Sequence, residues 1–106
     1  MNKEEKSAQF WDIAAPLLLT GQAEKGTMMG FPCLRVNGNF CASLDKDTAD
    51  VIVKLPADRV KELITTGEAV PFAPNGRTFR EWAKLTTTDE SHWQGLLDEA
   101  IAFVSA

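Results

Sequence analysis

The feature that most constrains the fold is a hairpin signal in residues 26–42, which read GTMMGFPCLRVNGNFCA. Asn37 and Gly38 lie between two runs in which apolar residues alternate with others, a setting that favours a two-residue turn. The apolar residues of both runs share one face only if the loop has three residues, 37–39. Because a one-residue slip moves every apolar side chain to the wrong face, we predict the three-residue loop, with Asn39 tolerating a left-handed backbone.

Periodicity predicts the elements on either side of this hairpin. Apolar residues at helical spacing indicate a helix over residues 3–19, kinked or restarted near Pro16 and ended by Gly21. Residues 27–55 read as three strands, or four if the segment TMM forms one of its own. Within them, the polar run DKDTAD at 45–50 is a turn, and VIVKL at 51–55 is a nearly continuous apolar strand.

The second half of the chain adds two helices and two strands. Pro56 suits the first position of a helix that Gly67 ends, and AVPF and TFREWAKL read as strands around a PNG turn. Thr87, with Glu90 three residues later, predicts a capping box for a last amphipathic helix. The sequence therefore predicts a single α+β domain over residues 1–106. We expect an antiparallel sheet of about five to six strands with three helices, in the order α-β-β-β-β-α-β-β-α.

Two cysteines, Cys33 and Cys41, flank the predicted turn. With a two-residue loop they point to opposite faces of the hairpin. With a three-residue loop they are diagonal neighbours, which stand roughly 7–8 Å apart, whereas disulfide-bonded cysteines have Cα atoms about 4.4–6.8 Å apart. We therefore predict two buried or half-buried reduced thiols, as is usual in the cytoplasm.

Composition and charge narrow the class of protein. A hydrophobic content of 44% with 25% charged residues is typical of a soluble globular domain. No apolar run approaches the ~20 residues of a membrane span, and no signal-peptide core follows the polar N-terminus, so we expect a cytoplasmic protein. The net charge of −4 opposes nucleic-acid binding, which depends on Lys and Arg. A locally basic surface is still possible, because residues 68–88 carry three basic and two acidic side chains.

No constellation of catalytic, cofactor-binding or metal-binding residues is visible. The glycines match neither the dinucleotide-binding nor the phosphate-loop spacing. His92 is the only histidine, and we interpret it as an exposed or capping residue at the start of the last helix. Asp45, Asp47 and Asp50 lack the glycine and the final glutamate of an EF-hand loop, so we interpret them as solvated turn residues. The sequence therefore favours a protein that is not an enzyme and has no cofactor.

One segment, TFREWAKL at residues 78–85, combines aromatic and cationic side chains. Alternation places Phe79, Ala83 and Leu85 on the core face of the predicted strand, with Arg80, Trp82 and Lys84 opposite. Such a face is either a solvated surface with cation–π packing or a recognition patch, because Trp and Arg are enriched at binding hot spots. The candidate partner-binding residues are Arg77, Arg80, Trp82, Lys84 and Arg35, and the secondary candidates are Met28 and Met29, which otherwise fill the core.

Several segments together resemble a known family. These are GTMMGFPCLRVNGNFCAS, VIVKLPADRVKELI, GEAVPFAPNGRTFREW and the closing amphipathic helix. They resemble the TfoX N-terminal-like domains, which are related to the MmcQ/YjbR group, over about residues 10–104. The resemblance implies a compact α/β domain without a known active site. Within these related families, TfoX proteins regulate natural competence, and some YjbR-like proteins have been proposed to bind DNA.

Two functions therefore stay open. The first is a non-enzymatic regulatory or interaction module that binds a protein partner. The second is a nucleic-acid-binding domain that uses Arg35 and the hairpin of residues 77–84. Because the chain is acidic overall, we expect a protein partner rather than nucleic acid. The sequence gives neither the partner's identity nor the oligomeric state.

Overall fold

The computed structural model describes residues 1–28 and 30–106, which form three helices and a six-stranded antiparallel sheet. The predicted α+β class and the element order are confirmed. The sheet order is β1-β2-β3-β4-β6-β5, so the last two strands exchange places relative to the chain. The elements are α1 Lys3–Leu19, β1 Glu24–Met28, β2 Phe31–Val36, β3 Asn39–Leu44, β4 Val51–Lys54, α2 Ala57–Thr65, β5 Ala69–Pro71, the short 3₁₀ turn η1 Pro74–Gly76, β6 Trp82–Leu85 and α3 Glu90–Ser105.

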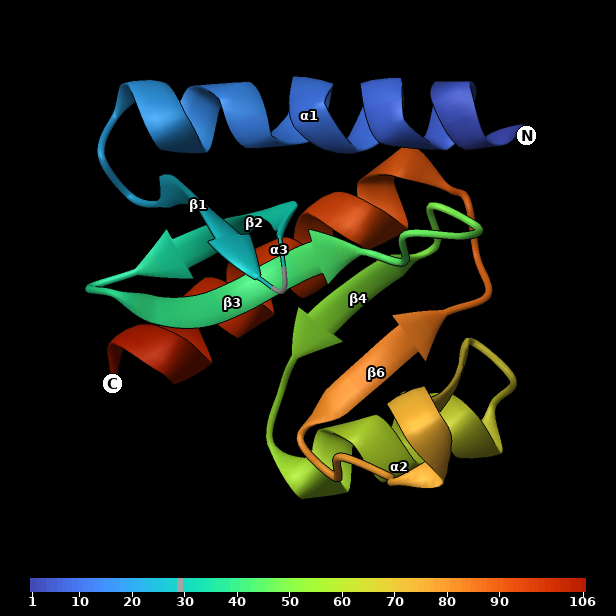
Figure 1. Cartoon of the computed structure of the whole chain (residues 1–106). Coiled ribbons are helices and arrows are strands. Elements are labelled where there is room, and N and C mark those ends of the chain that lie inside the picture. The colour runs from blue at the N-terminus through green and yellow to red at the C-terminus, as the bar shows by residue number, and fades with distance from the viewer. Residues whose placement is uncertain (29) are drawn as a thin grey trace.

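The helices pack against one face of the sheet. α3 contacts β2, β3 and β4, α2 contacts β5 and β6, and α1 contacts α3 and β1 (Figure 1). Strand alternation decides which side chains this packing buries. Ala42, Val53 and Ala83 are register partners on the helix-covered face and belong to the core. The opposite face, which we call the outer face, carries the adjacent register partners Ser43, Ile52 and Lys84.

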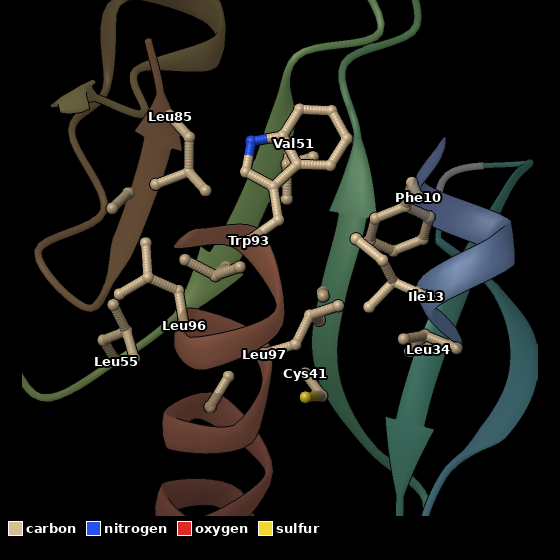
Figure 2. Close-up of a cluster of buried hydrophobic side chains, with 14 of the residues drawn as sticks. Phe10, Ile13, Leu34, Cys41, Val51, Leu55, Leu85, Trp93, Leu96 and Leu97 are labelled. Atoms are coloured by element: carbon tan, nitrogen blue, oxygen red, sulfur yellow. The ribbon is translucent and has the colours of Figure 1, made fainter. Parts of the chain in front are cut away.

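α3 supplies the centre of the core. Trp93, Leu96 and Leu97 are each at most 1% exposed, and Figure 2 shows Leu96 directed toward Leu55 and Leu97 toward the sheet. The indole Nε1 of Trp93 donates a hydrogen bond to the Thr87 carbonyl at 2.7 Å, so its polar atom is satisfied despite burial. The amphipathic character predicted for this last helix is confirmed.

The central hairpin corrects the predicted loop. Asn37 (φ 52°) and Gly38 (φ 81°) form a two-residue turn, and Val36 pairs with Asn39, so the three-residue loop is wrong. A bulge restores the apolar register one step further on. Arg35 pairs with Phe40 but Leu34 pairs with Ala42, which leaves one extra residue, Cys41, on β3. The Asn-Gly turn and the apolar pattern are both satisfied because the slip occurs inside the strand.

Both cysteines are free and buried, as predicted. Burial, with a smaller contribution from the neighbouring Cys33, raises the pKa of the Cys41 thiol to about 12. A thiol that stays protonated near neutral pH is a poor nucleophile, so Cys41 is part of the core and not a reactive site.

Two helix starts and one helix interior differ from the predictions. α1 continues through Pro16 without a restart, because Pro16 is exposed and the adjacent buried stripe holds the helix in place. Pro56 is the residue before α2 instead of its first residue. α3 is capped by Asp89, whose side chain accepts the His92 N–H at 2.9 Å, so the predicted capping box of Thr87 and Glu90 is wrong. The predicted helix terminators Gly21 and Gly67 both have positive φ.

Across residues 1–28 and 30–106, no helix has both the length and the apolar character needed to cross a bilayer.

Candidate interaction surface on the outer face

The structure shortens the strand on which the candidate residues were placed. β6 begins only at Trp82, because the chain before it turns: the Trp82 N–H donates to the Phe79 carbonyl at 3.1 Å. Phe79 therefore leaves the core face predicted for it and is 39% exposed. Arg77 and Arg80 lie in this connection and are exposed, whereas Trp82 and Lys84 remain side by side on the outer face.

Three aromatic rings meet where this connection folds over β6. The ring of Phe72 lies 6.1 Å from that of Phe79 and 6.4 Å from that of Trp82, centroid to centroid. Cations cover two of the rings. The Arg77 guanidinium is 5.7 Å from the Phe79 ring, and the Lys54 ammonium is 6.0 Å from the Trp82 ring.

A shallow hollow joins Arg80 and Glu81 to Lys54, Phe79 and Trp82. We call the surface formed by Lys54, Phe72, Arg77, Phe79, Arg80 and Trp82 the aromatic patch. Within the described part of the chain, its three cations form no ion pair. Glu81 is the one carboxylate that lines the hollow, so the surface is positive on a chain whose net charge is −4.

A cleft of about 550 Å³, lined by both apolar and polar residues, adjoins the aromatic patch on the outer face. Ser43, Ile52 and Lys84 form its floor, and residues 70–75 form one wall. The other wall contains Phe31 and the secondary candidate Met28. Met29, the other secondary candidate, lies outside the described residues. Phe72 belongs both to the cleft and to the aromatic cluster, so the two surfaces are continuous.

Lys84 differs from the other candidate cations because it is paired. Its ammonium lies 3.2 Å from Asp45 Oδ2 and 3.9 Å from Asp50 Oδ2, and Lys6 of α1 reaches Asp50 at 2.7 Å. This network connects α1, the β3–β4 turn and β6. Lys84 therefore holds the turn at the end of the cleft and is not a free cation for a partner.

Asp45 is the centre of that turn. Its Oδ1 accepts the N–H groups of Asp47 at 2.8 Å and Thr48 at 3.1 Å. Burial alone would raise the pKa of the Asp45 carboxyl, but these two hydrogen bonds and the Lys84 ammonium together hold it below its ordinary value. In the described residues no cluster of potential metal ligands is found, and the carboxylates of the turn serve as hydrogen-bond acceptors and ion-pair partners.

Arg35 does not join the aromatic patch. It lies on β2, which β3 and β4 separate from β6. Its Nη2 donates to the Thr27 carbonyl at 3.1 Å, and its guanidinium lies 4.7 Å from the Phe40 ring. A Cβ on Gly26 would come within 2.8 Å of Arg35 Nε, so glycine on β1 leaves room for this packing. Arg35 thus binds neighbouring strands together at the far end of the sheet.

His92 makes contacts that its position in the sequence does not reveal. Its Nε2 lies 2.7 Å from Glu68 Oε2, and its Nδ1 lies 2.8 Å from Thr87 Oγ1. Thr66 also donates to Glu68, at 2.6 Å. The order hydroxyl, imidazole, carboxylate is that of a catalytic triad. It lies outside both the cleft and the hollow of the patch, and it joins the start of α3 to the turn before β5. The contact is a link between elements.

Two residues of the aromatic patch, Lys54 and Phe72, were not among the candidates. Lys54 reaches Trp82 because β4 pairs with β6, and Phe72 reaches it through the fold of residues 72–81. Both contacts depend on long-range pairing, and no local pattern signals them.

No protein-family model, curated protein or solved structure matches this chain.

Proposed function

We propose that this chain is a non-enzymatic interaction module whose aromatic patch binds an acidic segment of a protein partner. The observation that carries the proposal is the composition of the patch. Two cations, Lys54 and Arg77, lie over aromatic rings, and a third, Arg80, lines the adjoining hollow. None of the three forms an ion pair within the described residues, and one of the rings, Phe79, is 39% exposed. Trp and Arg are the residues most enriched among those that dominate binding energy at protein interfaces.

Charge supports an acidic partner. The patch is positive, so it attracts carboxylates before other parts of the surface do. α3, by contrast, carries acidic side chains and neither Lys nor Arg, and it lies on the other side of the sheet. The same cations would also attract phosphates, but the overall charge of −4 repels a long polyanion and favours a short acidic protein segment.

A charge reversal tests the proposal. Arg80→Glu is expected to leave stability within about 0.5 kcal/mol of the wild type, because Arg80 is exposed and unpaired. It is expected to reduce strongly the recovery of specific protein partners. The measurement is a quantitative pull-down from nuclease-treated lysate, read by mass spectrometry at low and high salt. Recovery by the wild type should fall as salt rises.

Lys3→Glu is the matched control, since it makes the same charge change at an exposed position on α1. Equal losses for the two variants would show a non-specific charge effect and would contradict the proposal. Retention of partners by Arg80→Glu would contradict it as well.

DNA binding is the alternative function, and a separate experiment tests it. A gel-shift titration with single-stranded and duplex DNA is expected to show no retardation at low salt. Retardation that weakens steeply with salt and is lost in Arg80→Glu would replace the protein-partner proposal with DNA binding. The resemblance to the TfoX N-terminal-like domains and the cytoplasmic location both stay predictions.

A further inference from the structure

We infer that the cleft beside the aromatic patch receives one bulky apolar side chain, aromatic or large aliphatic, from the same acidic partner segment. This inference rests on the proposed function, because it takes the aromatic patch as the surface on which the segment lies. The proposed function places the carboxylates of the segment at the aromatic patch. The inference adds an apolar anchor in the cleft next to it.

The cleft has the size and lining of an anchor pocket. Its volume of about 550 Å³ exceeds the space of a single side chain, so the anchor enters with part of its backbone. Apolar side chains line the cleft from three places: Phe31 of β2, Ile52 of β4 and Phe72, which follows β5. Val70 stands at the rim and is 42% exposed, so the free protein leaves an apolar group in water at this position.

The polar groups of the cleft floor already have partners. Ser43 Oγ donates to the Pro32 carbonyl at 3.0 Å, and the Lys84 ammonium pairs with Asp45. An apolar occupant therefore covers these groups without leaving a donor or acceptor unpaired, which would oppose binding. A strongly polar ligand would have to compete with contacts that the protein makes internally. Lys46, Asp47 and Asn75 also line the cleft, but all three are exposed and keep contact with water. The satisfied floor therefore favours an apolar occupant beneath them.

Phe72 connects the two halves of the surface. It lines the cleft, and its ring also contacts those of Phe79 and Trp82. A segment whose carboxylates reach Arg77 and Arg80 thus has a neighbouring residue close to the mouth of the cleft. Pro71 and Pro74 lie in the wall and restrict its backbone, so little ordering is needed when the anchor enters.

The test uses two acetylated acidic peptides of Glu and Asp that differ only at one central residue, Phe in one and Ala in the other. Affinity is measured by fluorescence anisotropy for the wild type, Val70→Gln and Arg80→Glu. The wild type should bind the Phe peptide roughly tenfold more tightly than the Ala peptide. Val70→Gln should reduce this ratio to about threefold or less, because a polar group then replaces part of the apolar wall.

Arg80→Glu should lower the affinity for both peptides by a similar factor and leave the ratio of the two affinities unchanged. Leu19→Gln is the matched control for Val70→Gln, since Leu19 is 90% exposed on α1 and outside the cleft. In the wild type, the Phe peptide should also shift the amide resonances of Ile52, Val70 and Lys84 more than the Ala peptide does.

The outcomes separate the two claims. Equal affinity for the Phe and Ala peptides, or a ratio that survives Val70→Gln, would overturn the anchor while leaving the patch as a docking surface. If Arg80→Glu bound both peptides as tightly as the wild type, the proposed function would fail. Amide shifts confined to residues outside the cleft would also overturn the anchor.

Discussion

Leu97→Ala is expected to lower the free energy of unfolding by about 2–5 kcal/mol, the usual range for removing a large buried side chain. Leu97 is fully buried on α3, which contacts β2, β3, β4 and α1. The cavity left behind would lie between the helix and the centre of the sheet, where rigid neighbours cannot close it. A domain of this size has a total stability of roughly 5–15 kcal/mol. The urea midpoint of unfolding should therefore fall markedly.

Gln94→Ala provides the control on the same helix. Gln94 is exposed, and alanine is a good helix former, so its midpoint should stay close to that of the wild type. A midpoint for Leu97→Ala that matches the Gln94→Ala value would show that α3 is peripheral to the stability of the fold.

Asp45→Ala is expected to cost roughly 1.5–3 kcal/mol, the range for hydrogen bonds to a charged group. The substitution removes the acceptor of the Asp47 and Thr48 N–H groups and leaves Lys84 with its weaker partner, Asp50, at 3.9 Å. Asp45→Asn keeps an oxygen that can accept the hydrogen bonds of the turn but removes the charge. It should therefore lower the free energy of unfolding by less than Asp45→Ala does. Asp47→Asn should change stability little, because Asp47 is exposed.

The same network makes stability depend on pH. The folded-state pKa of Asp45 is below its ordinary value, about 3.9, so the unfolded chain binds the proton more readily. The stabilisation is therefore fully present above the ordinary pKa and is lost as pH falls through the folded pKa. Urea unfolding from neutral pH into this acidic range should show a steeper loss for the wild type than for Asp45→Asn. Parallel losses would show that Asp45 does not contribute to the acid sensitivity.

The parts of this fold that sequence predicts well are those that local chemistry decides. Gly21 and Gly67 end helices because their backbone is left-handed, and the stripe through Trp93 and Leu97 requires a helix with one buried face. The hairpin was predicted wrongly because its local signals disagree. The Asn-Gly turn favours a two-residue loop, and the apolar pattern favours a three-residue loop only if both strands are regular. The bulge at Cys41 makes the two-residue loop compatible with the apolar pattern.

The candidate surface was predictable only in part. Arg77, Arg80 and Trp82 are close in the chain and do lie on one surface. Lys54 could not be placed there before β4 was known to pair with β6. Lys84 was expected to be free, but residues of the β3–β4 turn neutralise it. Long-range strand pairing and ion pairing thus decide which cations a partner would meet.

Photo-crosslinking at Phe79 tests the docking surface most directly. The photoreactive residue p-benzoylphenylalanine would replace Phe79 in one variant and Leu19 in another, since both side chains are exposed and apolar. We expect light to link a protein partner at position 79 and not at position 19, and the Arg80→Glu change should abolish that link. Crosslinks at position 19 alone, or crosslinks at position 79 to nucleic acid alone, would contradict a protein-docking role for the aromatic patch.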